Sequence, residues 1–200
     1  IVFAPSVRQM YPEGFQTSVE VRRLSEPFEG AARPGHFRGV ATIVTKLLNL
    51  VQPTVAYFGQ KDYQQARAIQ QVVRDLNLPV AIRVLPTVRE SDGLAMSSRN
   101  ASLTPAQRHQ ATVLARALRL GQARIRAGER DPKKVLALMR RRIRSFDSRH
   151  GPRPWTRSGF RPTGRARGAP PAVPRIRIEY LAIVGAHTLE PASRLKGRVA

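Results

Sequence analysis

The hydrophobic pattern of the first hundred residues switches between two periods. Apolar residues recur every three or four positions from residue 37 to residue 50, and Pro53 ends this pattern, which predicts an amphipathic helix. The short apolar run TVAYFG then predicts a buried strand over residues 54–58, ending at Gly59. A second helix is predicted in KDYQQARAIQQVVRDLNL and a second strand near residues 80–88. This alternation across short connections is typical of a parallel α/β sheet.

The pattern becomes mainly helical after residue 100. LTPAQRHQATVLARALRLGQARIRAG predicts a long helix, with Thr104 as N-cap, Pro105 at the first helical position and Gln107 completing a capping box. DPKKVLALMRRRIRSF predicts another helix, and the strand-like run RIRIEYLAIV lies near residues 175–184.

Residues 149–174 differ in composition from the rest of the chain. They contain no acidic residue and are dense in Pro, Gly and Arg. Such a segment cannot bury a core, so we predict a disordered insert. Arg-rich disordered segments also bind RNA, and Trp155 and Phe160 could stack on bases, so RNA binding is the alternative.

The net charge of +22 is concentrated in the second half of the chain. Residues 1–100 carry 12 Lys and Arg against 8 Asp and Glu, whereas residues 101–200 carry 23 against 5. The basic excess therefore says nothing about the function of the first half.

Composition excludes several classes of protein. The chain has no cysteine, which excludes a disulfide framework and a thiolate metal site, and its four scattered histidines argue against zinc. No apolar run reaches membrane-spanning length and no signal peptide is visible, so we expect a cytoplasmic protein without membrane contact. The chain opens with Ile1 inside an apolar run, from which we expect a fragment.

The stretch FGQKDYQQ lies where open α/β sheets bind ligands, beyond the carboxyl end of a strand. Gly59 permits a tight turn, and Lys61 and Asp62 fall at the start of a helix whose free N–H groups favour an anion. Lys61 can pair with a phosphate there, and Gln64 and Gln65 can reach into the same cleft. The alternative is an ordinary turn with a solvated lysine.

The stretch DGLAMSSRN follows the second predicted strand in the same way. Ser97 and Ser98 supply hydroxyls and amides, Arg99 supplies a guanidinium suited to phosphate, and Gly93 lets the loop close. The alternative is a turn that leads into a helix cap. In a third stretch, EGAARPGHFRGV, His36 stands at a predicted helix start, where it either binds a substrate or caps the helix.

Four stretches are distinctive in combination: YPEGFQTSVEV, FEGAARPGHFRGVATIVTKLLNLVQP, FGQKDYQQ and PTVRESDGLAMSSRNASLTPAQR. In this order they closely resemble the pantothenate synthetase family (pantoate–β-alanine ligase, AMP-forming). The resemblance is nearly continuous from Ile1 to Arg108 and returns at IEYLAIVGAHTLEP. It implies an α/β fold with a Rossmann-like nucleotidyltransferase (HUP-type) parallel sheet, here partial, over residues 1–87. A smaller α+β C-terminal domain is implied over residues 88–200.

The resemblance also implies a reaction. ATP and pantoate give pantoyl adenylate and pyrophosphate, and the amine of β-alanine then attacks the adenylate to give pantothenate and AMP. Mg²⁺ accompanies ATP, and the family is usually a cytoplasmic homodimer with small-molecule substrates rather than nucleic acid.

The family's site residues carry over at matching positions. Its Gly-Glu-Lys-Asp nucleotide-binding turn matches Gly59, Gln60, Lys61 and Asp62, and its second ATP loop matches Met96, Ser97, Ser98 and Arg99. Val88 matches a position lining the adenine site, Gln65 matches a glutamine that binds pantoate, and His36 stays a candidate for substrate binding. Because the attack of a carboxylate on the α-phosphorus brings two anions together, Lys61 and Arg99 are predicted to stabilise charge.

The chain departs from the family pattern at one site residue and at both ends, since it also stops at LKGRVA, before the closing strand that the resemblance implies. Gln60 replaces the usual glutamate, and the His-x-Gly-His motif that supplies the family's catalytic histidine is absent, because it would lie upstream of Ile1. We therefore expect the isolated chain to turn over slowly or not at all. Two alternatives stay open: a basic RNA-binding protein that uses the Arg-rich half, and a related adenylate-forming nucleotidyltransferase that acts on another acid.

Overall fold

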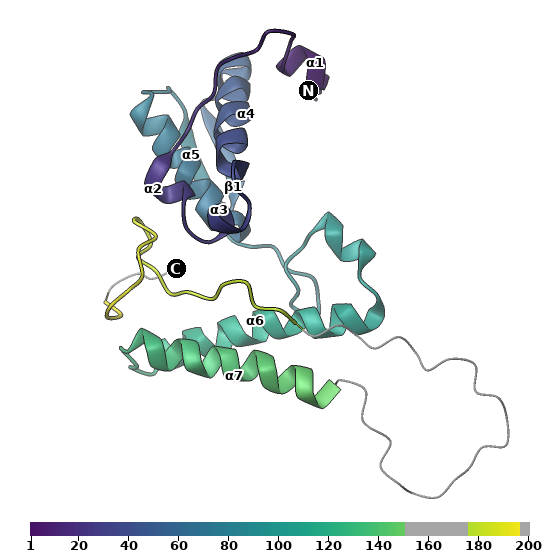
Figure 1. Cartoon of the computed structure of the whole chain (residues 1–200), viewed down its shortest axis with the longest axis vertical. Coiled ribbons are helices and arrows are strands. Elements are labelled where there is room, and N and C mark those ends of the chain that lie inside the picture. Colours follow the sequence, from purple (N-terminus) through teal and green to yellow (C-terminus); the bar gives the residue numbers. More distant parts are fainter. Residues whose placement is uncertain (151–175, 197–200) are drawn as a thin grey trace, which may run out of the picture. The chain divides into compact units, whose positions relative to one another are not determined.

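The computed structural model of the chain describes residues 1–150 and 176–196 (Figure 1). They belong to two compact units. The first unit comprises Ile1–Thr87 with Ala186–Leu189, and the second comprises Val88–Gly185 with Glu190–Ala200. No helix of the described residues is both long enough and apolar enough to span a membrane.

The first unit contains six helical segments and two strands among its described residues. In chain order they are α1 (Val7–Met10), α2 (Arg22–Ser25), α3 (Glu29–Ala32), α4 (His36–Val51), β1 (Val55–Gly59), the 3₁₀ turn η1 (Gln60–Asp62), α5 (Tyr63–Asp75) and β2 (Ala81–Leu85). The predicted alternation of helix, strand, helix and strand is confirmed. The second strand is shorter than predicted and ends at Leu85.

The two strands pair in parallel, in a register that joins Val55 to Ala81 and Gly59 to Leu85. Because α5 connects them, β1, α5 and β2 form a βαβ unit, and both strands end at the same edge of the sheet. The described chain is therefore an α/β structure with a small two-stranded parallel sheet, and most of its ordered elements are helices.

The strand predicted over residues 54–58 forms, but it is half exposed, so the prediction that it is buried is wrong. Tyr57 is 64% exposed and Leu85 is 49% exposed, while their neighbours along each strand are partly buried. Successive side chains of a strand point to opposite faces of the sheet. Helix α5 packs against both strands, and the alternate side chains are left facing solvent.

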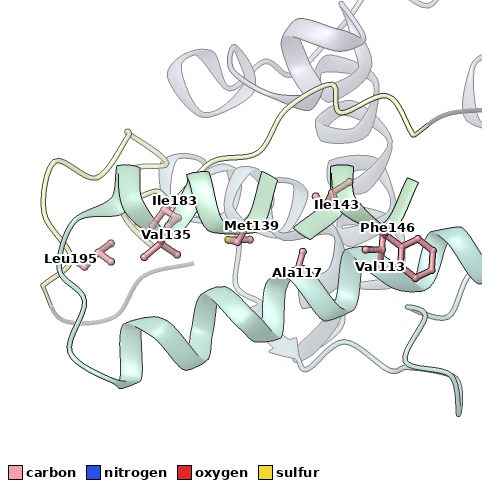
Figure 2. Packing of buried hydrophobic residues seen from close by; sticks show 8 residues of the cluster. All are labelled: Val113, Ala117, Val135, Met139, Ile143, Phe146, Ile183 and Leu195. Carbon is pink, nitrogen blue, oxygen red and sulfur yellow. The ribbon is translucent and has the colours of Figure 1, made fainter. Parts of the chain in front are cut away.

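The second unit is built around two long helices, α6 (Pro105–Arg126) and α7 (Pro132–His150). Figure 2 shows the side chains of its core, which come from these two helices and from the segment after residue 176. The cluster consists of Val113, Ala117, Val135, Met139, Ile143, Phe146, Ile183 and Leu195. Gly121 lets the helices approach closely, because a β-carbon there would lie 2.6 Å from the sulfur of Met139. The apolar residues that recur at helical spacing in each sequence thus form the faces with which the two helices pack against each other.

The predicted boundaries of these helices are confirmed by their hydrogen bonds. Thr104 caps α6 by accepting from the Gln107 amide at 3.3 Å, and the Gln107 side chain accepts from the Thr104 amide at 2.9 Å, which completes the capping box. Pro105 occupies the first turn. Gly128, just after α6, has a positive φ of 100°, and Asp131 accepts from the Lys133 amide at 2.8 Å before α7.

The strand predicted over residues 175–184 is not formed in the described part of that run. Its apolar residues Ile178 and Ile183 pack against the core of α6 and α7 instead. The run has one isolated bridge, between Val184 and Pro191, and proline cannot donate a ladder hydrogen bond. The expected α+β character of residues 88–200 therefore appears as two helices with an extended segment against them.

Helix α7 reaches His150, so the first two residues of the predicted insert at 149–174 are helical. The rest of that insert lies outside the described residues.

Candidate functional site

The turn after β1 presents a cation and a carboxylate at the start of α5. Lys61 and Asp62 lie in η1 and are exposed. Lys61 makes no ion pair with another described residue, and the Asp62 side chain makes no capping bond to α5. Both groups are therefore free to meet an anionic ligand or its counterion. Gly59 is extended, with φ of −81° and open space around its missing β-carbon, so this turn does not require a glycine.

Gln64 is a structural tether, and the expectation that it reaches into the ligand cleft is wrong. Its side-chain amide donates to the carbonyls of Leu24 and Pro27, each at 2.8 Å, and accepts from the Glu29 amide at 3.3 Å. These bonds hold the α2–α3 segment against α5. Gln65, the predicted pantoate ligand, is half-buried and makes none of these bonds.

Two further residues of α5 were missed by sequence reasoning. The Tyr63 hydroxyl donates to the carbonyl of Ala186 at 2.7 Å, and the Arg67 guanidinium donates to that of His187 at 3.2 Å. They attach the GAHT turn to the helix that begins beside Lys61. The only signal in the sequence was the return of the family resemblance at IEYLAIVGAHTLEP.

An open cavity of about 290 Å³ lies in the first unit, next to the third predicted stretch. Arg22, Arg33 and Arg38 line it together with Glu20 and Glu26. His36 is not among the lining residues. It is the first residue of α4 and half-buried, and its ring lies 5.1 Å from that of Phe37.

The second predicted loop begins with a tight turn, which was the alternative to a ligand-binding loop. Arg89 and Ala95 form an antiparallel bridge, and Gly93 has a φ of +88° that favours glycine. The Asp92 carboxylate accepts from the Leu94 amide at 3.0 Å. The carbonyl of Val88, the predicted adenine-site residue, accepts from the Met96 amide at 3.0 Å. The side chains of Val88 and Met96 are 63% and 57% exposed.

The two serines and the arginine of this loop have different local roles. The Ser97 hydroxyl accepts from the Arg99 amide at 3.3 Å and so caps the 3₁₀ turn η2 (Ser98–Ser102). Ser98 and Arg99 are exposed, and Arg99 forms no ion pair with a residue that the structure describes. The turn-and-cap alternative thus describes the backbone, while the guanidinium and the Ser98 hydroxyl stay available to a ligand.

Four residues around this loop were not predicted as functional: Glu90, Asp92, Asn100 and Arg108. One guanidinium nitrogen of Arg108 bridges the two carboxylates, 2.5 Å from Glu90 and 2.8 Å from Asp92. The Asn100 side chain donates to Glu90 at 2.6 Å and to the carbonyl of Ala95 at 3.0 Å. One feature of the sequence could have identified these four residues. Carboxylates, an amide and an arginine that can pair with one another lie close together in VRESDGLAMSSRN and in the helix that follows.

These contacts shift the titration of the three charged groups. Hydrogen bonds from Arg108 and Asn100 hold the pKa of Glu90 below its ordinary value. The Leu94 amide, followed by Arg108, lowers the pKa of Asp92. In return, the two carboxylates raise the pKa of Arg108, mainly through its bond to Glu90.

We expect this cluster to lose its stabilising effect in acid. Because the pKa values of Glu90 and Asp92 are lower in the folded chain than in the unfolded chain, their contribution is complete above the ordinary carboxyl range, about pH 4. It is lost as the pH falls through the lowered values.

Thermal unfolding of the wild type and of a Glu90→Gln, Asp92→Asn double variant between pH 7 and pH 2 measures this effect. The difference in unfolding temperature between the two should shrink towards the acid end. The exposed Glu13→Gln variant is the control and should follow the wild type throughout. A difference that stays constant with pH would contradict the prediction.

The predicted site residues are divided between the two units. The turn from Gly59 to Asp62, Gln65 and His36 belong to the first unit, whereas Val88 and the loop from Met96 to Arg99 belong to the second. Within the described ranges, no group of three or more His, Asp or Glu side chains could hold a metal ion.

Comparison with known proteins identifies relatives along the whole chain. The family model Pantoate-beta-alanine ligase matches residues 1–199. The pantothenate synthetase of Moorella thermoacetica is 49% identical over 198 residues, which are 99% of this chain and 60% of that protein. The chain thus spans about 60% of the length of this curated relative.

Solved structures agree with this assignment. The crystal structure of pantothenate synthetase from Thermus thermophilus matches 98% of this chain and 62% of its own, with 42% identity and a TM-score of 0.82. A structure of pantoate-beta-alanine ligase from Francisella tularensis, complexed with beta-gamma ATP and beta-alanine, matches 68% of this chain with 33% identity and a TM-score of 0.54. With the motifs of both loops in place and the family model matched over residues 1–199, the chain belongs to the pantoate-beta-alanine ligase family.

Proposed function

We propose that this chain is the ATP- and pantoate-handling part of a pantothenate synthetase. The reaction is the ATP-dependent condensation of pantoate with β-alanine through pantoyl adenylate, giving pantothenate, AMP and pyrophosphate. One observation carries the proposal: within a chain of this family, the cations Lys61 and Arg99 are exposed and unpaired among the described residues, each in a predicted ATP loop. The Francisella tularensis relative, which was solved in complex with beta-gamma ATP and beta-alanine, supports the substrate class.

The residues present suit adenylate formation because the reacting groups are all anions. The pantoate carboxylate attacks the α-phosphorus, a bond forms between them, and the bond to the bridging oxygen breaks with release of pyrophosphate. Lys61 and Arg99 stabilise the charge on the phosphate oxygens, and amides and hydroxyls such as that of Ser98 orient them. No side-chain nucleophile is needed, because the substrates attack one another.

The remaining site residues have roles in binding. We assign Gly59, Gln60 and Asp62 to the nucleotide turn, Met96 and Ser97 to the second ATP loop, and Val88 to the adenine. Gln65 is assigned to pantoate, because a neutral amide can hydrogen-bond a hydroxyl or carboxylate without adding charge. His36 is kept as a candidate substrate ligand.

The Mg²⁺ that accompanies ATP would find one suitable carboxylate in this turn. Asp62 is exposed and makes no capping bond to α5. Magnesium is often held by one or two carboxylates together with substrate phosphates and water, so Asp62 fits this ion. The metal would neutralise part of the triphosphate charge when bound.

The proposal extends to the organisation of the protein. We assign residues 1–87 to a Rossmann-like, nucleotidyltransferase-type domain and residues 88–200 to a C-terminal domain that covers the site. A cytoplasmic homodimer is the expected assembly. Analytical ultracentrifugation of the chain tests the dimer.

The experiment that tests the function is a titration of the chain with ATP, alone and with pantoate, by calorimetry. Mass spectrometry of the same mixture detects pantoyl adenylate. We expect specific ATP binding that survives deletion of residues 149–174, with adenylate that forms slowly and only when pantoate is present. Adenylate formed with another acid, and not with pantoate, would replace this function with that of a related nucleotidyltransferase.

RNA binding is the outcome that would favour the other alternative. The exposed face of α7 carries Arg140, Arg141 and Arg144, which line an open cavity of about 550 Å³. If RNA binds tightly, loses affinity steeply as salt is raised and is released by the deletion of residues 149–174, while ATP does not bind, the enzyme proposal fails.

A further inference from the structure

The backbone of the loop from Met96 to Arg99 is held by side chains that do not belong to the predicted site. Asn100, directly after the loop, donates through its side-chain amide to the carbonyl of Ala95, directly before the loop, at 3.0 Å, and also to the Glu90 carboxylate at 2.6 Å. Arg108 then attaches Glu90 and Asp92 to helix α6, at 2.5 Å and 2.8 Å. The loop is therefore connected to the longest helix of the second unit.

The turn from Glu90 to Leu94, which precedes the loop, contains two of the same residues, Glu90 and Asp92. The Glu90 amide donates to the Leu94 carbonyl at 2.8 Å, and the Gly93 amide donates to the Glu90 carbonyl at 2.8 Å. Asp92 accepts from the Leu94 amide while its other oxygen faces Arg108. The orientation of both carboxylates is thus coupled to the backbone that leads into Ser97.

The charges of Glu90, Asp92 and Arg108 give a second reason for this arrangement. Glu90 and Asp92 are two anions beside a loop that is predicted to hold a polyphosphate. Arg108 bridges both, so its single positive charge offsets one of their two negative charges, and Arg99 makes no ion pair within the described chain. Loss of Arg108 would remove the cation that bridges the two carboxylates and add one net negative charge beside the predicted ligand, and like charges at short range repel.

We propose that Glu90, Asp92, Asn100 and Arg108 are positioning residues that fix the loop from Met96 to Arg99 in its ligand-binding form. They act through the loop and do not touch the substrate. This inference rests on the proposed function for the identity of the ligand, ATP, whereas the control of loop conformation does not depend on any ligand.

The test compares four forms of the full chain: wild type, Arg108→Met, Arg108→Lys and the control Arg126→Met. Arg126 lies on the same helix, is exposed and makes no ion pair with a described residue, so its replacement removes the same charge elsewhere. Each form is measured by thermal unfolding, by hydrogen exchange of the loop amides without ligand, and by ATP titration.

We expect Arg108→Met to speed exchange at the amides of Met96, Arg99 and Asn100. It should weaken ATP binding by up to about 100-fold, the cost of a lost hydrogen bond to a charged group when the loop is displaced. Arg108→Lys should restore part of both, because a single nitrogen makes both contacts and an ammonium has three donors. Arg126→Met should resemble the wild type. If Arg108→Met does not fold, Asn100→Ala, which removes two hydrogen bonds without changing charge, provides the same readouts.

The outcomes separate this inference from the proposed function. Unchanged exchange in Arg108→Met and in Asn100→Ala would overturn the inference, whatever the affinity for ATP. Faster exchange together with wild-type ATP affinity would overturn the link to ligand binding. If the wild type binds no ATP although exchange responds to Arg108, the proposed function fails and the loop support stands.

Discussion

Replacing Arg99 with alanine is expected to weaken ATP binding by about 10- to 100-fold, the cost of losing a hydrogen bond to a charged group. Lys61→Ala is expected to have an effect of the same size. Both side chains are exposed and make no ion pair within the described chain, so neither replacement removes a contact that the fold uses. The unfolding temperature should therefore stay close to that of the wild type.

Calorimetric titration with ATP at fixed salt measures this prediction, with Arg83→Ala and Arg126→Ala as controls that each remove one exposed cation elsewhere. If the two controls weaken ATP binding as much as Arg99→Ala and Lys61→Ala do, the effect is that of net charge. The specific roles of the two loops would then be contradicted. A fall in affinity with the two loop variants alone would support both assignments.

Replacing Gly30 with alanine is expected to destabilise the first unit by about 3 kcal/mol or more, the upper range for overpacking. Gly30 lies in α3, and a β-carbon on it would stand 1.6 Å from the Ser25 carbonyl oxygen and 2.7 Å from its carbon. Backbone atoms cannot move away as a flexible side chain does. The α2–α3 segment would have to shift, although Gln64 holds it at Leu24 and Pro27.

Gly39→Ala is the matched control for this prediction. Gly39 lies in helix α4, and apart from its chain neighbours and the backbone of that helix no atom lies within 4 Å of its missing β-carbon. Alanine should stabilise that helix by up to about 1 kcal/mol, because it lowers the conformational entropy of the unfolded chain and favours the helix. Urea unfolding followed by circular dichroism and by amide signals of α5 compares the variants. Equal midpoints for Gly30→Ala and Gly39→Ala would contradict the packing described around α3.

The sequence predicted the ligand-binding groups of the second loop, but not all the residues that hold this loop in place. The motif DGLAMSSRN contains the groups that would meet a ligand, and Gly93 and Ser97 have the turn and cap roles that their types indicate. Asp92 and Asn100 inside the motif support the loop together with Glu90 before the motif and Arg108 after it. Eighteen positions separate Glu90 from Arg108, and no short pattern pairs them.

The local elements could be predicted from the sequence because short-range interactions determine them. The capping box of Thr104 and Gln107 acts over three residues, and the apolar spacing of α4 and α5 is set by the helical repeat. The parallel pairing of the two strands follows from the helix that connects them. The motifs that match the family also lie within single stretches, so the chemistry they imply could be named before any coordinates.

Only the tertiary structure decided what depends on partners distant in the chain. The exposure of Tyr57, the tether made by Gln64 and the extended course of residues 176–184 each depend on which surface lies opposite. The periodic pattern of a strand states which side chains share a face, but not how many of its faces are covered. For the same reason Arg108 is one cation among many in the sequence, whereas in the fold it is the residue that joins the carboxylates of Glu90 and Asp92, next to the predicted ATP loop, to helix α6.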